Sequence, residues 1–169
     1  MKILVCVSCV PDTTAKINFT PDNKEFVSAG VTFILNPYDE IALSKAVDLA
    51  TANNGTVTVI NVGDPSNEAV IRKALAIGAN DAVRINSLPR DSYFVAKQIA
   101  DYVKKNPFDI ILCGRESSDH NGSSVPVMIA ELLEIPCILF AKSLAIDGST
   151  ATLDSEIEGG KEVITTSMP

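Results

Sequence analysis

The sequence predicts an α/β protein with three layers, in which helices cover both faces of a mostly parallel five-stranded sheet. Apolar runs of strand length alternate with amphipathic segments of helix length along most of the chain, and this alternation is typical of parallel sheets. The chain has 169 residues, of which 46% are hydrophobic, so it can bury a core without disulfides or metal. We therefore expect residues 1–169 to form a single domain.

Five near-continuous apolar runs predict the parallel strands, because strands that are covered on both faces carry few polar side chains. These runs are residues 2–7, 56–62, 81–85, 109–113 and 137–140.

Four helices are expected between and after these strands. The first begins at Asn36, which suits an N-cap, followed by Pro37 at the first helical position and Asp39 in the first turn. The second is predicted to end at Gly78, where a left-handed residue suits a C-terminus. The second, third and fourth helices are expected at residues 66–77, 92–105 and 126–133.

Two segments interrupt the alternation of strands and helices. Residues 16–19 and 25–28 flank a Pro-Asp-Asn turn and predict a β-hairpin inserted between the first strand and its helix. Residues 143–167 alternate in polarity and are punctuated by two turn dipeptides that end in glycine, which predicts a C-terminal antiparallel meander.

Composition excludes several classes of function. The chain carries 21 acidic and 14 basic side chains and has no basic run, so nucleic acid is not expected as a partner. The apolar N-terminal run lacks the small-residue cleavage site of a signal peptide. No stretch approaches the ~20 apolar residues that a membrane span needs. We expect a cytoplasmic protein without membrane insertion.

The polar segment 114–124 follows the fourth predicted strand and leads into a helix. Ligands of parallel sheets bind at the carboxyl ends of the strands, and small residues before a helix N-terminus suit a phosphate. An ordinary surface loop remains an alternative. A hydrolase that uses the loop serines with Asp119 and His120 is disfavoured, because a triad needs side chains that converge from separate segments.

Cys6 and Cys9 form a Cys-x-x-Cys motif, which is compatible with a redox pair, with zinc ligands or with structural thiols. Cys6 lies inside a predicted strand, whereas a thioredoxin-like pair opens a helix. Cys113, Cys137 and His120 do not have zinc-site spacing. Buried, free structural thiols are favoured.

Several pieces of the sequence resemble, in order and spacing, the β subunit of electron transfer flavoproteins, in the bacterial branch that is related to nitrogen-fixation-type subunits. These pieces are Val10-Pro11-Asp12-Thr13 after the first strand, Asn36-Pro37-Tyr38-Asp39, Ala74 to Ala79, Leu112-Cys113-Gly114-Arg115 with Asp119, and Glu158-Gly159-Gly160.

The resemblance implies a Rossmann-like fold, similar to adenine nucleotide alpha hydrolases, and a heterodimer with an α subunit that shares FAD and accepts electrons from dehydrogenases. The chain itself would be an electron carrier subunit, not an enzyme, and would bind AMP or a second FAD. Carried over by position, its nucleotide site would use Cys6, Asn36, Pro37, Tyr38, Asp39, Val62, Asp119, His120, Asn121, Gly122, Ser123, Ser124 and Val125.

Some positions depart from the family pattern. Pro126 stands where the family has glycine and removes a backbone donor. Family members continue past the residues that match Ser167 and Met168 into an arm that wraps the α subunit, so we expect this chain to bind that subunit much more weakly than a version extended through the arm. A stand-alone adenine-nucleotide-binding protein of the universal-stress type is the alternative, suggested by Gly122-Ser123-Ser124.

Overall fold

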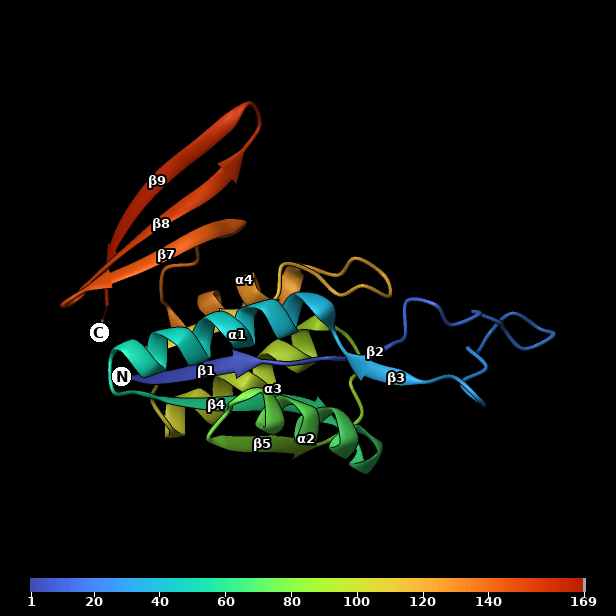
Figure 1. Cartoon of the computed structure of the whole chain (residues 1–169). Coiled ribbons are helices and arrows are strands. Elements are labelled where there is room, and N and C mark those ends of the chain that lie inside the picture. The colour runs from blue at the N-terminus through green and yellow to red at the C-terminus, as the bar shows by residue number, and fades with distance from the viewer. Residues whose placement is uncertain (169) are drawn as a thin grey trace.

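Four parallel strands form the central sheet of the computed structural model, which describes residues 1–168 (Figure 1). The spatial order is β5-β4-β1-β6, so the chain builds the sheet outward from β1 in one direction and then returns to its other side. Cys6, at the end of β1, lies in register with Ile60 of β4 and with Cys113 of β6. The strands are β1 (Lys2–Cys6), β4 (Thr56–Gly63), β5 (Asp81–Asn86) and β6 (Ile110–Cys113).

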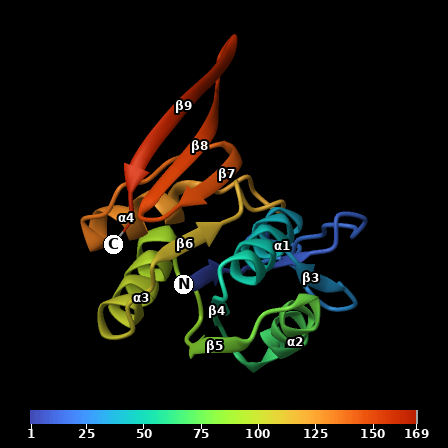
Figure 2. The ribbon, with the colours of Figure 1, turned by 60° about the vertical axis from the view of Figure 1, so that its left-hand side comes forward.

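Helices cover both faces of this sheet (Figure 2). On one face Ile3, Val5 and Val59 pack with α1 (Pro37–Ala52) and α2 (Glu68–Ile77). On the other face Leu4 and Ile60 pack with α3 (Ser92–Lys105) and α4 (Ser124–Leu133). Alternate residues of a strand point to opposite faces, so the near-continuous apolar runs contribute side chains to both halves of the core. The three-layer α/β/α prediction is confirmed.

The predicted fifth strand at residues 137–140 was wrong. This segment connects α4 to β7 without strand structure, and no described backbone hydrogen bond joins it to β6. Two of its carbonyl groups accept hydrogen bonds from residues of the C-terminal antiparallel sheet. Phe140 O accepts from Glu156 N at 3.0 Å, and Leu139 O accepts from Ser155 Oγ at 2.8 Å. An apolar run shows that a segment favours burial but does not show which neighbour it will pair with.

The four predicted helices are present, with small shifts at their starts. Helix α3 has the predicted bounds, and Asp91 caps it by accepting a hydrogen bond from Phe94 N at 2.7 Å. Helix α2 starts later than expected because a 3-10 turn, η1 (Pro65–Asn67), precedes it. Asp64 caps this turn, since its side chain accepts a hydrogen bond from Ser66 N. Helix α4 starts at Ser124, before Pro126.

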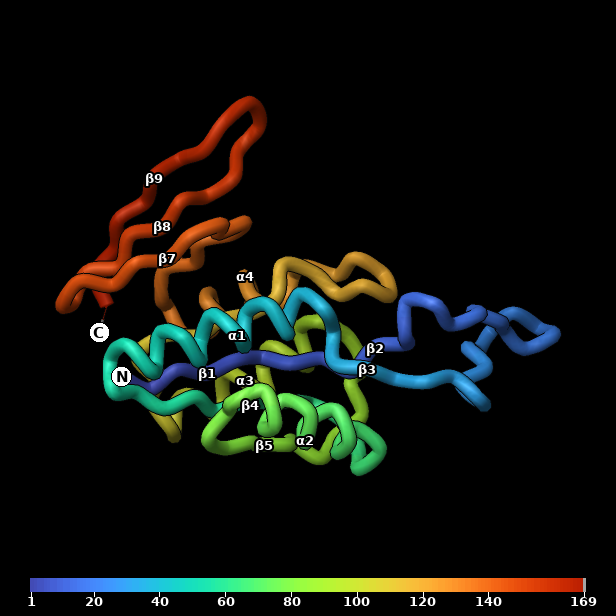
Figure 3. Tube along the Cα trace, in the orientation of Figure 1, coloured from blue at the N-terminus to red at the C-terminus, as the bar shows by residue number. Residues whose placement is uncertain are grey.

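The insertion between β1 and α1 is an arm rather than a regular hairpin. Strand pairing occurs at its base, where β2 (Cys9–Pro11) runs antiparallel to β3 (Phe33–Leu35). Residues 12–32 then project beyond the carboxyl edge of the parallel sheet (Figure 3). The expected strands 16–19 and 25–28 are reduced to one bridge, Phe19 to Phe26, whose rings meet edge to face at 6.5 Å.

The C-terminal meander is confirmed as a three-stranded antiparallel sheet in the order β7-β8-β9. Gly148 and Gly159 occupy the two turns with positive φ, which glycine adopts without steric cost. Leu144 and Leu153 turn inward and join the part of the core that α1 covers. The strands are β7 (Ala141–Asp147), β8 (Thr150–Ile157) and β9 (Gly160–Ser167).

Candidate functional site

Three segments meet at the carboxyl ends of β1 and β6. They are Ser8 after β1, the start of α1 at Asn36 to Asp39, and the segment from Gly114 to Ser118 after β6. The strand order reverses at β1, and such a reversal is where parallel sheets bind ligands. The segments are joined by hydrogen bonds of two buried polar side chains, Asp39 and Asn36.

Asp39 holds the end of β1 to the end of β6. Its Oδ2 accepts hydrogen bonds from Ser8 N at 2.8 Å and from Ser8 Oγ at 2.5 Å, and its Oδ1 accepts from Gly114 N at 3.1 Å. Burial raises the pKa of this carboxyl above its usual value, and the hydrogen bonds from Ser8, Asn36 and Gly114 oppose that rise. The side chain is therefore occupied with the protein itself.

Asn36 joins the start of α1 to the loop after β6. Its Nδ2 donates to Glu116 O at 2.9 Å, and its Oδ1 accepts from Ser118 N at 3.3 Å. The side chain consequently makes no capping bond to its own helix, although its position is the N-cap. The helix start is served by the Asn36 carbonyl, which accepts from Asp39 N and Glu40 N at 3.0 Å each.

Gly114 allows the β6 loop to approach α1 closely. A β-carbon at this position would overlap with Asp39 Oδ1 and with the backbone of Tyr38 and Asp39. The contact between the two segments therefore requires glycine, which has no side chain to clash.

Ser118 contributes a buried polar atom to the site. Its Oγ is buried and has no hydrogen-bond partner within residues 1–168. A buried hydroxyl without a partner costs free energy, so a ligand group that bonds to it would be stabilised. Ser123, at the N-cap of α4, makes no side-chain cap either, which leaves the first N–H groups of that helix to other acceptors.

The tip of the loop, Asp119 to Gly122, folds on itself and not onto α1. Ser117 closes it, because Ser117 N donates to Gly122 O at 2.9 Å and Gly122 N donates to Ser117 Oγ at 3.1 Å. His120 Nδ1 lies 2.8 Å from Asp119 Oδ1 in an exposed pair. No described hydrogen bond links His120 to a serine hydroxyl, so the hydrolase alternative has no support here.

The other predicted site residues differ in how far they are buried. Cys6 and Val62 are buried at the ends of β1 and β4, whereas Pro37 is exposed and Tyr38 is half-buried. Ser124 is exposed and Val125 is half-buried at the start of α4. The structure thus joins Asn36 and Asp39 to the loop through Gly114, Glu116 and Ser118, and not through residues 119–125.

Asn61 also lies at this carboxyl edge of the sheet, although it was not among the predicted site residues. Its buried Nδ2 donates to Val7 O at 2.8 Å, and its Oδ1 accepts from Asn67 Nδ2 at 3.0 Å. The bond ties β1, where it ends, to β4 and the turn that precedes α2. A signal was present in the sequence, since an amide interrupts the apolar run Val59-Ile60-Asn61-Val62.

The four cysteines are free thiols, but their burial differs from the expectation. Cys6 is buried, Cys9 and Cys113 are half-buried, and Cys137 is exposed, so the prediction of burial was wrong for Cys137. A hydrogen bond to Cys113, burial and nearby negative charge raise the pKa of Cys6, and burial raises the pKa of Cys9 and Cys137. Thiols in such surroundings are weak nucleophiles at neutral pH. No group of metal-ligating side chains occurs within residues 1–168.

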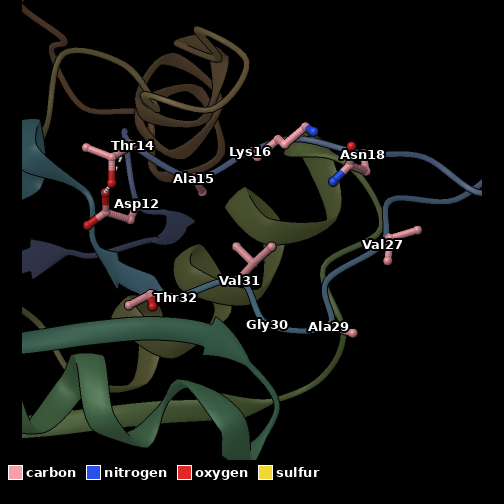
Figure 4. A pocket seen from close by; sticks show the side chains of 10 residues that line it. All are labelled: Asp12, Thr14, Ala15, Lys16, Asn18, Val27, Ala29, Gly30, Val31 and Thr32. Carbon is pink, nitrogen blue, oxygen red and sulfur yellow. Dashed lines mark hydrogen bonds between the residues drawn. The ribbon is translucent and has the colours of Figure 1, made fainter.

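One hollow lies within the arm, and another begins at the site. A polar one of about 370 Å³ lies within the arm and contains none of the predicted site residues (Figure 4). Its acid, Asp12, accepts hydrogen bonds from Thr14 Oγ1 at 2.6 Å and Thr14 N at 2.8 Å, which lower its pKa. An apolar groove of about 1130 Å³ begins beside Tyr38, Gly114 and Ser123 and continues along β6.

Residues 24–169 match the family described as "Electron transfer flavoprotein domain". The whole chain is 34% identical to the electron transfer flavoprotein subunit beta of Thermoanaerobacterium thermosaccharolyticum and 35% identical to that of Bacillus subtilis. It covers 66% of each of these relatives, or just under two thirds of their length. It is also 31% identical, over its whole length, to Protein FixA of Azotobacter vinelandii, of which it covers 63%.

Among solved structures, the chain resembles a universal stress protein in complex with cAMP. The TM-score is 0.42 and the identity is 17%, with 82% of this chain and 94% of the other covered. No helix within residues 1–168 is both long and apolar enough to cross a membrane.

Proposed function

The chain belongs to the electron transfer flavoprotein family, as a protein of the β-subunit type, and on that premise we propose that it is an electron-transfer subunit that works with an FAD-carrying α subunit. Electrons would come from dehydrogenases and pass through flavin, which supplies the redox chemistry when bound. The residues of this chain would bind and orient the flavin and shield it from water. They would not make or break substrate bonds.

Within that role, the chain is proposed to bind one adenine nucleotide, AMP or a second FAD, at the junction of β1, α1 and β6. The observation that carries this proposal is the buried Ser118 Oγ without a partner, next to the backbone that Asn36 positions. A nucleotide offers hydroxyl and phosphate oxygens as acceptors. The donors at the start of α4 suit phosphate, although Pro126 supplies none.

Asp39 is given a positioning role and not a direct contact with the nucleotide. Both of its carboxylate oxygens are already used by Ser8 and Gly114, and a free carboxylate would repel a phosphate. Asp39 and Asn36 would set the distance between α1 and the β6 loop, and Ser118 would touch the ligand.

Calorimetric titration with AMP and with FAD tests the nucleotide proposal. We expect one of the two to bind, and Ser118→Ala to weaken that binding about tenfold, as the loss of one hydrogen bond does. Because the buried Ser118 Oγ has no partner in the protein, the same variant should keep or raise its unfolding temperature. Ser44→Ala, on the exposed face of α1, is the matched control and should change neither quantity by much.

Two results would count against the nucleotide site. Absence of binding by either nucleotide would remove it, and unchanged affinity in Ser118→Ala would move it elsewhere. The subunit proposal has a separate test, co-elution of the chain with a flavin-loaded α subunit from a sizing column. A yellow complex is expected, and independent elution of the two proteins would contradict the proposal.

A further inference from the structure

The dipeptide Asn-Gly occurs twice in the sequence, at Asn54-Gly55 and at Asn121-Gly122. This dipeptide favours deamidation, because glycine has no side chain to keep its backbone nitrogen from attacking the neighbouring side-chain amide. Both asparagines have a positive φ, 49° for Asn54 and 55° for Asn121. The two places therefore share their sequence and their backbone region, and they differ in what holds the glycine nitrogen.

The nitrogen of Gly55 is held by the main chain. It donates a hydrogen bond to Ala50 O at 2.8 Å, in the last turn of α1. The residue is also enclosed, because a β-carbon on Gly55 would overlap with Met1 O, and that oxygen accepts from Thr56 N at 2.8 Å. Displacement of the Gly55 nitrogen would therefore disturb the end of α1 and the start of β4 together.

The nitrogen of Gly122 is held by a side chain. It donates to Ser117 Oγ at 3.1 Å, and no other acceptor of this N–H occurs within residues 1–168. Two further bonds close the same loop, from Ser117 N to Gly122 O and from Asn121 N to Ser117 O, each at 2.9 Å. All three bonds lie inside the loop and none reaches a helix or a strand. The Gly122 nitrogen can therefore move when the loop tip alone opens.

We infer that Asn121 is a site of spontaneous deamidation and that the hydroxyl of Ser117 limits the rate of the reaction. The Gly122 nitrogen gives its proton to hydroxide and forms a bond to Cγ of Asn121. The bond from Cγ to Nδ2 breaks, and the leaving nitrogen takes a proton from water and departs as ammonia. Water then opens the succinimide ring at either carbonyl, which leaves aspartate or isoaspartate. No electrons are transferred, and water is the one co-reactant.

The hydrogen bond to Ser117 opposes this reaction in two ways. It fixes the position of the attacking nitrogen, and the proton that must be lost is the one donated to Ser117 Oγ. Isoaspartate adds a main-chain carbon between residues 121 and 122, so Asn121 N and Gly122 O can no longer both stay opposite Ser117. The modification therefore opens the loop tip. This inference concerns the loop tip alone and is independent of the proposed nucleotide.

Ageing of the purified chain at mildly alkaline pH, followed by peptide mass spectrometry, tests the inference. The mass change of an amide that becomes a carboxyl should accumulate in the peptide that contains Asn121, and much less in the peptide that contains Asn54. Enzymatic methylation with S-adenosylmethionine, which labels isoaspartate, should mark the same Asn121 peptide. Gly122→Ala should suppress the reaction, because its methyl group hinders the attack, and the nearest atom to that methyl group is Nε2 of the exposed His120 at 3.1 Å.

The role of the hydroxyl has its own variant and control. Ser117→Ala should raise the rate at Asn121 about fivefold, the change in the open population that corresponds to the loss of one hydrogen bond, and should leave the rate at Asn54 unchanged. Ser28→Ala removes the hydroxyl of an exposed serine in the arm and should change neither rate. Circular dichroism checks that each variant folds. If Ser117→Ala does not fold, the comparison of Asn121 with Asn54 and the Gly122→Ala variant decide.

Any of four results overturns the inference. These are no deamidation at Asn121, a rate at Asn54 equal to or above that at Asn121, an unchanged rate at Asn121 in a folded Ser117→Ala variant, and an unchanged rate there in Gly122→Ala. The measurements contain no nucleotide and no α subunit. Their outcome therefore leaves the proposed function untouched, and failure of the proposed function leaves this inference untouched.

Discussion

The backbone N–H of Gly114 donates to Oδ1 of Asp39 at 3.1 Å, across the carboxyl edge of the sheet. The two residues are 75 positions apart in the sequence. The bond exists because Gly114 has no side chain, since a β-carbon there would occupy the same space as that oxygen. The end of β6 is thereby held against the first turn of α1.

Gly114→Ala should therefore destabilise the fold by about 3 kcal/mol, because the atoms that must move are backbone and a buried carboxylate. Urea unfolding measures this free energy. Gly160→Ala is the matched control, since a β-carbon at that position meets nothing within 4 Å, and its effect should be small. Equal unfolding free energies for the two variants would show that the edge relaxes around the methyl group.

The buried carboxyl of Asp39 should make its own contribution to stability depend on pH. Burial raises its folded pKa, so this contribution is fully present below the unfolded pKa and is lost as the pH rises through the folded pKa. Asp39→Asn does not titrate. The unfolding free energy of the wild type minus that of Asp39→Asn should therefore fall as the pH rises above about 4, the usual pKa of an aspartate.

Denaturant unfolding of both proteins across this range measures the difference. The exposed carboxyls are shared by the two proteins and cancel in the subtraction. A difference that grows with pH would mean that the hydrogen bonds from Ser8 and Gly114 outweigh burial, and that the folded pKa is lowered.

Asn36→Asp should loosen the loop after β6. The donor that Asn36 Nδ2 supplies to Glu116 O would be replaced by a carboxylate oxygen, which repels that carbonyl and costs about 2 kcal/mol. Hydrogen exchange at the amide of Ser118 should become faster. Asn80→Asp is the control, because Asn80 acts as an acceptor from Val57 N at 2.7 Å and aspartate keeps that role. Unchanged exchange at Ser118 would contradict the bridging role of Asn36.

The cysteines should react in the order of their exposure. Iodoacetamide is expected to modify Cys137 first, Cys9 and Cys113 more slowly, and Cys6 only when the protein unfolds. The reaction should accelerate as the pH rises, because the pKa of Cys137 is raised by burial and by the nearby Cys113. Peptide mass spectrometry gives the order. Early modification of Cys6 would show that the end of β1 opens readily.

Features set by neighbouring residues could be predicted from the sequence. The bounds of α3 follow from the Asp91 cap and from apolar residues at helical spacing, and both signals lie within the segment itself. The turns of the meander follow from glycines that adopt positive φ. The resemblance to the family also depends on short local motifs, and the match of residues 24–169 to the family confirms it.

Features that depend on distant partners could not be predicted. The run 137–140 is as apolar as a buried strand, but its carbonyl groups bond to β8 and it does not pair with β6. Asn36 reads as a helix cap, yet its amide reaches Glu116 and Ser118. A polar side chain shows that a hydrogen bond is needed and leaves open which of several partners lies within reach.

In Figure 1 the arm of residues 12–32 projects to the right, and the β7-β8-β9 sheet projects upward above α1 and α4. Such projections increase hydrodynamic drag without adding proportionate mass. The monomer should therefore elute from a sizing column earlier than a compact protein of equal mass and be mistaken for a larger species. Light scattering, which reports mass independently of shape, is the measurement by which the oligomeric state of this chain should be judged.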